Sequence, residues 1–204
     1  MKRLSPYLCL FLLPLLALEC EEEDFTPDPD NSGLPAYTEK GANIWGAMVD
    51  DVVYRSSIDC NFYGCNSGMY MQNIYYQDTS AQSVALISFS GYKPGFENEF
   101  IQINFYLGTT IPPYGFYEEF QGVRFDLSDS SSFAEIDSYL PYSDSSYCTI
   151  SKNGYLQFNR FDETESTYQY HNLHAAGTFE FYIENDSCSN VRVEKGRFDF
   201  DFIR

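Results

Sequence analysis

The chain has 204 residues and a formal net charge of −18, from 12 basic and 30 acidic side chains. Such a surface repels phosphate backbones, which excludes nucleic acid as an expected partner. The length suits one domain, and an aromatic content of 18 % favours strands, because bulky rings suit a pleated surface.

Residues 1–19 have the three parts of a secretory signal peptide. Lys2 and Arg3 form the basic start, and an apolar core of about eleven residues follows over residues 8–18. The core is too short to cross a bilayer, which needs about 20 apolar residues. Cleavage before Cys20 leaves an N-terminal cysteine that can be acylated, so we expect a lipid anchor at Cys20.

The residues around the cysteine resemble a bacterial lipobox, although Glu19 stands where Gly, Ala or Ser is usual. The acids of residues 21–24 resemble the export tag of Bacteroidota-type lipoproteins, which implies the outer face of the outer membrane. An ordinary solvated charge run and plain secretion are the alternatives. Loss of Lys2, Arg3 and Glu19 changes the net charge from −18 to −19. The charge holds the body away from anionic lipid, so the lipid is the expected membrane attachment.

Residues 20–35 are predicted to form an acidic flexible tether, because they contain hardly any hydrophobic side chain. Pro27, Pro29 and Pro35 stiffen this segment locally. The stretch 28–33 resembles a calcium loop but lacks the bidentate acid that such a loop needs, which favours a linker.

The body, residues 36–204, begins with two apolar runs, 41–50 and 51–55, which predict a hairpin turning at Asp50 and Asp51. Further strands are predicted over 69–76, 83–90 and 99–107. The last of these is the clearest, because it alternates an apolar face with a polar face. The apolar face is Ile101, Ile103, Phe105 and Leu107, and the other face is Gln102, Asn104 and Tyr106.

Residues 108–121 break the strand pattern, since adjacent prolines exclude a regular helix or a central strand. Tyr114, Phe116 and Tyr117 of this loop form either a stacking surface for a ligand or, as we favour, a lid over one end of the core. A strand over 122–127 follows, and a capping box at 132–135 predicts one or two helical turns.

The last third predicts two hairpins. The first joins 147–150 to 155–162 through the turn signal Asn153-Gly154, and the second joins 177–184 to 191–202 with a bulge near Gly196. Together these elements predict an all-β fold, a single antiparallel β-sandwich or barrel-like domain of about ten strands after a disordered tether. The side chains expected inside from this region are Phe179, Phe181, Ile183, Phe198, Phe200 and Phe202.

Both ends of the body resemble a group of small, uncharacterised Bacteroidota-type surface lipoproteins. The opening stretch 41–50 is similar to their Gly-x-Asn-Thr-Phe-Gly motif, with Trp45 in place of Phe. The closing stretches 177–181 and 196–199 are similar to their Gly-Thr-Phe-Glu-Phe and Gly-Arg-Phe-Asp motifs. The resemblance implies a surface-anchored β-domain and carries no known activity.

Four cysteines remain once Cys9 leaves with the signal and Cys20 takes lipid: Cys60, Cys65, Cys148 and Cys188. In an oxidising compartment these are expected to form disulfides. Three connectivities exist, and we favour Cys60 with Cys65 and Cys148 with Cys188, because the first pair brackets a short turn. Zinc binding is the alternative, but the paired spacing of a zinc ribbon is missing.

The sequence presents no constellation typical of an enzyme, and we expect no catalytic residues, metal or cofactor. His171 and His174 are the only histidines, and on a strand their spacing puts them on opposite faces rather than in one metal site. The sequence lacks a nucleophile elbow, a phosphate loop and a zinc-protease motif. A hydrolase with an acidic pair is the alternative, since carboxylates are abundant.

The leading hypothesis is therefore a non-catalytic lipoprotein of the cell surface that binds a glycan or peptide or serves beside a larger outer-membrane complex. A structural envelope protein is a further alternative, which predicts exposed strand edges or a large apolar patch. The candidate ligand-binding residues are aromatic and fall in turns or loops: Tyr63, Tyr92, Tyr114, Phe116 and Tyr117.

Overall fold

The computed structural model describes residues 26–56, 59–61, 64–66, 68–75, 83–110, 117–128, 131–139, 146–148, 151–167, 170–184 and 190–203. Within these ranges the protein is all-β, with one short 3-10 turn, η1 (Tyr117–Phe120). No helix in the described part of the chain is long and apolar enough to span a membrane. The predicted fold class is therefore confirmed.

In the described part of the chain, eleven strands form one antiparallel sheet, and two further strands, β3 (Asp59–Asn61) and β4 (Gly64–Asn66), pair separately. Ten of the eleven follow one continuous path, in the order β10-β9-β7-β6-β2-β1-β13-β12-β11-β8, and β5 pairs with β6 beside it. Their bounds are β1 (Ile44–Val49), β2 (Val52–Arg55), β5 (Met69–Tyr75), β6 (Ser83–Lys93), β7 (Phe96–Leu107), β8 (Arg124–Asp126), β9 (Phe133–Tyr139), β10 (Ser146–Cys148), β11 (Ser151–Thr167), β12 (Tyr170–Ile183) and β13 (Val191–Ile203).

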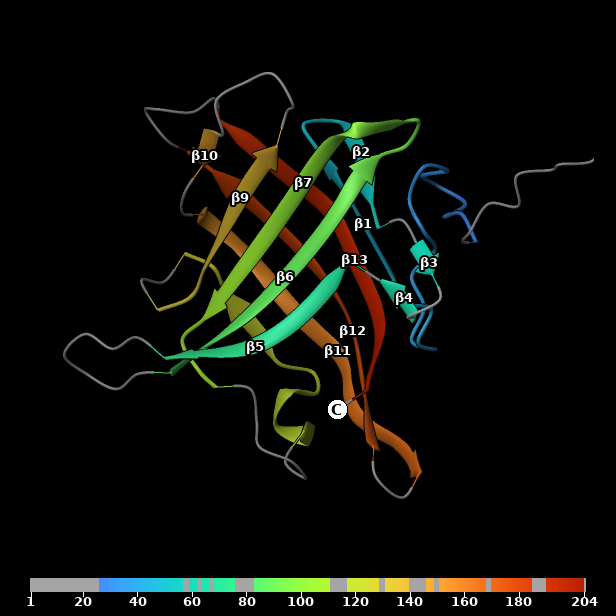
Figure 1. The fold of residues 1–204 in the computed structure, drawn as a ribbon. Coiled ribbons are helices and arrows are strands. Elements are labelled where there is room, and N and C mark those ends of the chain that lie inside the picture. Colours follow the sequence, from blue (N-terminus) through green and yellow to red (C-terminus); the bar gives the residue numbers. More distant parts are fainter. Residues whose placement is uncertain are drawn as a thin grey trace, which may run out of the picture.

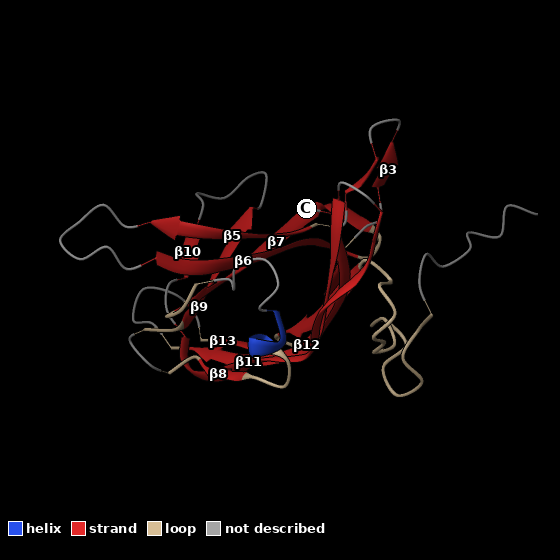
Figure 2. Cartoon of the chain, turned by 90° about the horizontal axis from the view of Figure 1, so that it is seen from below, coloured by secondary structure: helices blue, strands red, loops and turns tan. Residues whose placement is uncertain are grey.

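The sheet curls into a flattened, nearly closed barrel (Figures 1 and 2). Strands β5, β6, β7 and β9 form one wall, and β8, β11, β12 and β13 form the opposite wall (Figure 2). Among the described residues, the Ser151 hydroxyl bridges the opening near the two ends of the path. Ser151 Oγ donates to the Leu127 carbonyl over 2.6 Å and accepts from the Ala134 amide over 3.0 Å, so it links β9 to the segment after β8.

Aromatic side chains fill the barrel interior. Phe89 lies near its centre, with ring centroids of Phe105, Phe179 and Phe198 between 5.2 and 5.6 Å away. Burial of each such ring contributes about 2 to 3 kcal/mol relative to leaving it exposed. Phe120 of η1 is 5 % exposed and packs on Phe158, so η1 is held against the core. The lid prediction concerns Tyr114, Phe116 and the side chain of Tyr117, which lie outside the described residues.

The predicted hairpin at the start of the body is confirmed. Strands β1 and β2 pair up to Val49 and Val52, and Asp50 and Asp51 take φ values of 47° and 64°. A two-residue turn with both residues at positive φ matches the twist of the strands, and Asp tolerates this conformation better than most residues. Asp50 Oδ1 also accepts a hydrogen bond of 2.9 Å from the Arg192 amide, which ties the turn to β13.

The predicted irregularity in β13 is also present. Across β12 the pairing passes from Phe179–Gly196 to Phe181–Val193, so β13 carries one extra residue at this point. Lys195 has a φ of 53°, which marks a bulge. Gly196 lies under the Phe179 ring, where a Cβ would approach ring carbon to 2.4 Å, so the position requires glycine.

Two predicted local elements are wrong. Residues 132–139 do not form the predicted helical turns, because Phe133–Tyr139 is strand β9, paired with β7 along its whole length. Asn153-Gly154 is not a hairpin turn, because both residues lie within β11 and pair with β12. Strand β10 pairs with β9 instead of with β11.

The segment from residue 26 to residue 43, which we call the N-terminal strap, crosses the outside of the barrel (Figure 2). The sequence predicts a flexible tether up to residue 35, whereas the structure packs residues 26–35 against the body. Leu34 is fully buried, and Asp28 pairs with Arg197 of β13. The short apolar stretch of Leu34 and Pro35 against Gly46 of β1 explains why this part is ordered.

Candidate functional site

The outer surface of the β5, β6, β7 and β9 wall is the first candidate site. Alternation along these strands puts one set of side chains into the core and the other set on this outer surface. Ile103 and Phe105 of β7 point inward and are fully buried, so Gln102 and Asn104 between them point outward. We call eight side chains of the outward set the aromatic–amide face: Tyr70, Ser88, Tyr92, Phe100, Gln102, Asn104, Tyr106 and Phe133.

Three polar side chains hold one another at the middle of this face. Gln102 Nε2 donates to Ser88 Oγ over 2.9 Å and to Asn104 Oδ1 over 3.0 Å. Ser88 Oγ donates to Asn104 Oδ1 over 2.6 Å. These bonds fix both amide orientations. They also leave Asn104 Nδ2 and Gln102 Oε1 without a hydrogen-bond partner among the described residues, so one donor group and one acceptor can meet a ligand.

Aromatic pairs stand at both ends of the polar centre. At one end, the rings of Tyr92 and Phe100 are 5.4 Å apart and tilted. At the other end, the rings of Tyr106 and Phe133 stack at 4.7 Å with an interplanar angle of 17°. Phe100 and Tyr106 are six positions apart on one strand, so the two pairs are separated by about 20 Å at the rise of an antiparallel strand.

The charges beside the aromatic–amide face are mostly negative. Glu135 and Asp137 of β9 are on the outward positions opposite Asn104 and Gln102, and both are partly exposed. Arg55 of β2 is the register partner of Tyr92 and is already engaged in an interaction of its own. The face therefore combines ring surfaces and amide groups with a negative margin.

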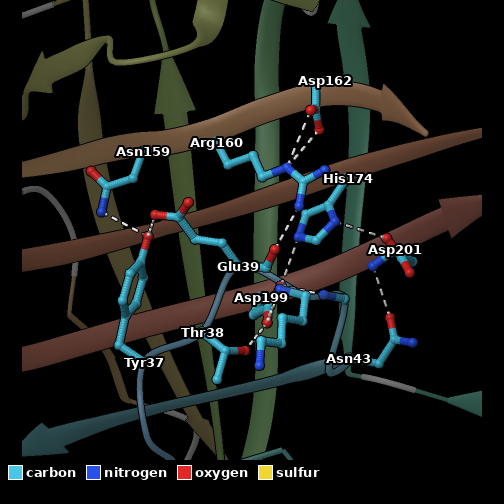
Figure 3. A network of polar contacts seen from close by, with 12 residues as sticks. Tyr37, Thr38, Glu39, Asn43, Asn159, Arg160, Asp162, His174, Asp199 and Asp201 are labelled. Atoms are coloured by element: carbon cyan, nitrogen blue, oxygen red, sulfur yellow. Dashed lines mark hydrogen bonds and ion pairs between the residues drawn. The ribbon is translucent and has the colours of Figure 1, made fainter.

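A second polar cluster lies beneath the N-terminal strap on the opposite wall (Figure 3). Asp199 of β13 accepts hydrogen bonds from the Thr38 hydroxyl, from the Lys40 amide over 3.1 Å and from the Gly41 amide over 2.8 Å. Burial by itself raises the pKa of Asp199, but these hydrogen bonds outweigh burial and hold the pKa below its usual range.

His174 of β12 is buried between two carboxylates in the same cluster. Its Nε2 is 2.8 Å from Asp199 Oδ1, and its Nδ1 is 3.2 Å from Asp201 Oδ1 (Figure 3). Both ring nitrogens are therefore used within the protein. Gly41 is at positive φ beside Asp201, where a Cβ would come within 2.1 Å of the carboxylate, so only glycine lets the strap approach this closely.

Side chains at both ends of the strap complete its attachment. Asp28 pairs with Arg197, and the Arg197 guanidinium lowers the pKa of Asp28 to about 2. Tyr37 donates to Glu39 and accepts from Asn159 of β11, and burial followed by the Glu39 hydrogen bond raises the Tyr37 pKa.

The hollow beside the strap, lined by Thr38, Arg197 and Asp199 among others, has no room for a water molecule. The cluster beneath the strap is thus a structural attachment, with its carboxylates and imidazole turned toward one another. No group of three or more potential metal-ligating residues occurs in the described ranges. His174 belongs to the strap attachment, and the side chain of His171 is outside the described part.

Of the predicted ligand-binding residues, Tyr92 lies within strand β6 and not in a turn or loop as predicted, and its side chain is on the aromatic–amide face. The backbone of Tyr117 is in η1, and its side chain lies outside the described residues. Tyr63, Tyr114 and Phe116 also lie outside them. The sequence analysis missed Tyr70, Phe100, Gln102, Asn104, Tyr106 and Phe133 as site residues, although the alternation of Gln102, Asn104 and Tyr106 was the signal that pointed to an outward row.

The cysteines lie at the margins of the described structure. Cys60 and Cys65 are direct register partners in the β3–β4 pair, which is the backbone arrangement that a cross-strand disulfide requires. The backbone of Cys148 is in β10, whereas Cys188 and Cys20 lie outside the described ranges. The disulfides and the lipid on Cys20 remain predictions.

Comparison with known proteins gives no further assignment. No protein-family model, curated protein or solved structure matches the chain. The geometry of the aromatic–amide face therefore carries the functional argument.

Proposed function

We propose that this protein is a non-catalytic binding module held at the outer surface of the cell by lipid on Cys20, with the aromatic–amide face as its ligand site. The signal peptide, the cysteine and the acidic run of residues 21–24 support the location. The resemblance to Bacteroidota-type surface lipoproteins supports it too. The ligand is a glycan or a peptide, and the module acts alone or as an accessory subunit beside a larger outer-membrane complex.

One observation carries the binding proposal. The network of buried Ser88 with partly exposed Gln102 and Asn104 holds two amides in fixed orientations on the outer side of the sheet, between two aromatic pairs. Preorganised polar groups lose little conformational entropy when they bind, and aromatic rings supply large rigid contact areas. A face that served only solubility would carry flexible charged side chains at these positions.

Binding is tested with the mature domain on arrays of glycans and peptides, followed by calorimetry on each hit. We expect Asn104→Ala and Tyr106→Ala to weaken binding about tenfold or more, which corresponds to about 1.4 kcal/mol or more. Tyr182→Ala and Gln157→Ala are matched controls, because both residues are half-buried on the outer surface of the opposite wall. Equal binding by all four variants would overturn the assignment of the face. Turnover of a bound glycan by the wild type would favour the acidic-pair hydrolase.

The location is tested on the protein from its native membrane by intact-mass analysis and by protease shaving of whole cells. We expect an acyl mass on Cys20 and release of the body by external protease. An unacylated mass would show that Glu19 prevents lipoprotein processing, and protection from protease would contradict surface display.

A further inference from the structure

We infer that the ligand of the aromatic–amide face is an extended, uncharged oligosaccharide. This inference rests on the proposed function and names the ligand class of the same site. It depends on the chemistry of the face, its length, its charge and the place of its strands in the sheet.

The groups on the face match the two kinds of surface that a neutral sugar presents. A pyranose ring has C–H faces that pack on aromatic rings, and it has hydroxyl groups at its rim that both donate and accept. Tyr106 with Phe133 and Tyr92 with Phe100 offer the ring surfaces. Asn104 Nδ2 offers donors and Gln102 Oε1 offers an acceptor, which suits hydroxyl partners better than groups that only accept.

The length of the face favours an oligosaccharide over a monosaccharide as the ligand. The two aromatic pairs are about 20 Å apart, so one monosaccharide can reach only one pair or the amide centre. A linear chain of several sugars can contact both pairs and the centre at once. The contacts then act within one molecule, which raises the affinity far above that of any single contact.

The charges disfavour an acidic glycan. Glu135 and Asp137 border the amide centre, and the whole chain carries a net charge of −18. Arg55 is beside Tyr92 but is engaged in an interaction of its own, so it does not offset both acids. Uronates and sulfates would meet repulsion on approach, whereas neutral hydroxyls would not.

A peptide fits the centre of this face less well, because its main chain would find no partner on β6 and β7. Extended peptides commonly bind by adding a strand to a free sheet edge. Strands β6 and β7 run through the middle of the sheet, where the β5–β6, β6–β7 and β7–β9 ladders use the backbone groups beneath the face. A ligand at the centre of this face meets side chains only.

The test uses the mature domain with neutral and acidic polysaccharides of matched linkage and length, and with the array peptides. We expect the binding glycans to be neutral, with affinity that rises from the disaccharide to chains of about four sugars and changes little between low and high salt. Asn104→Ala and Tyr106→Ala should each weaken the longest neutral ligand about tenfold, while Tyr182→Ala leaves it unchanged. Circular dichroism and melting curves establish that each variant is folded.

Two further variants test the charge argument. Glu135→Gln with Asp137→Asn should leave the neutral ligand unchanged within about twofold and should raise binding of the matched acidic oligosaccharide. If the wild type binds an acidic glycan or a peptide and the face variants weaken that binding, the inferred ligand class is wrong, whereas the proposed binding site is retained. Binding that no face variant alters would overturn the proposed site itself.

Discussion

Asp199 links the N-terminal strap to the barrel through a single carboxylate. It is 2 % exposed and receives hydrogen bonds from the strap on one side, while His174 lies against it on the other. Removal of one partner from such a set leaves buried donors unsatisfied, which is more destabilising than the loss of one bond. The carboxylate therefore stabilises the strap far more than an exposed acid would.

We expect Asp199→Ala to lower the free energy of unfolding by about 3 kcal/mol, because it leaves Thr38 and His174 without their acceptor. Asp162→Ala is the control, since Asp162 forms a partly exposed ion pair with Arg160 and should change stability by less than about 1 kcal/mol. Urea unfolding of both variants measures the difference. Similar losses in the two would show that the buried contacts are not the main attachment.

Low pH should weaken the contact between Asp28 of the strap and Arg197 of β13, because it protonates Asp28. Its folded-state pKa of about 2 is below the value near 4 of an unfolded aspartate, so the Asp28–Arg197 contact stabilises the protein fully above pH 4. This contribution is lost as the pH falls from about 4 through about 2. We expect the melting temperature of Asp28→Asn to fall less steeply than that of the wild type over this range. Asp30→Asn, an exposed neighbour in the same loop, should follow the wild-type curve.

At the scale of elements, the β1–β2 turn gives different roles to adjacent aspartates. Both have positive φ, but Asp50 also accepts from the Arg192 amide. We expect Asp51→Gly to raise the free energy of unfolding by about 0.5 kcal/mol, because glycine relieves the left-handed strain. Asp50→Gly should give no gain, since the relief is offset by the lost acceptor. Equal denaturation midpoints for the two variants would contradict this division.

The elements that could be predicted from the sequence are those with strict alternation or a defined turn. Residues 100–107 and 179–183 alternate cleanly, and each became a strand with its apolar face inside. Residues 133–139 read equally well as a capped helix, because Phe133, Ile136 and Leu140 also have helical spacing. The segment forms a strand because it pairs with β7. The local sequence carries no signal of this long-range contact.

The wrong turn at Asn153-Gly154 has a related cause. Asn-Gly is the strongest short-range hairpin signal, but here Gly154 lies against Phe181 of the neighbouring strand, where a Cβ would come within 2.4 Å. Glycine at this point allows close approach between β11 and β12 rather than chain reversal. The shift in register between Ser151 and Asn153 absorbs the irregularity.

At the scale of the whole molecule, half of the candidate site was visible in the sequence and half was not. The outward row of β7 follows from alternation alone. Its partners Ser88, Tyr70 and Phe133 come from three other strands, and only the strand order and register bring them beside it. The sequence favours aromatic residues in loops as ligand-binding residues, because loops often bind ligands. The aromatic–amide face is instead built on the rigid sheet.

The disulfides should stabilise the molecule at two distant places. Ser151 pairs with Ile183, so the chain leaves this end of the β11–β12 ladder three residues from Cys148 and five residues from Cys188. We expect peptide mapping without reduction to find Cys60 with Cys65 and Cys148 with Cys188. Reduction should lower the free energy of unfolding by about 2 to 5 kcal/mol. Recovery of free thiols at all four positions, or of a crossed pairing, would contradict this prediction.

The strap also determines how the molecule responds to force. A pull on the N-terminus enters the described structure at residue 26 and reaches the Asp28–Arg197 pair before the Thr38–Asp199 contact. These side-chain contacts break one after another as the strap peels away, whereas β1 behind them is held by backbone ladders to both β2 and β13. The wall of β5, β6, β7 and β9, whose outward side chains form the aromatic–amide face, lies away from the strap (Figure 2). A domain anchored at its N-terminus would therefore lengthen by releasing the strap and keep the shape of its face while under tension.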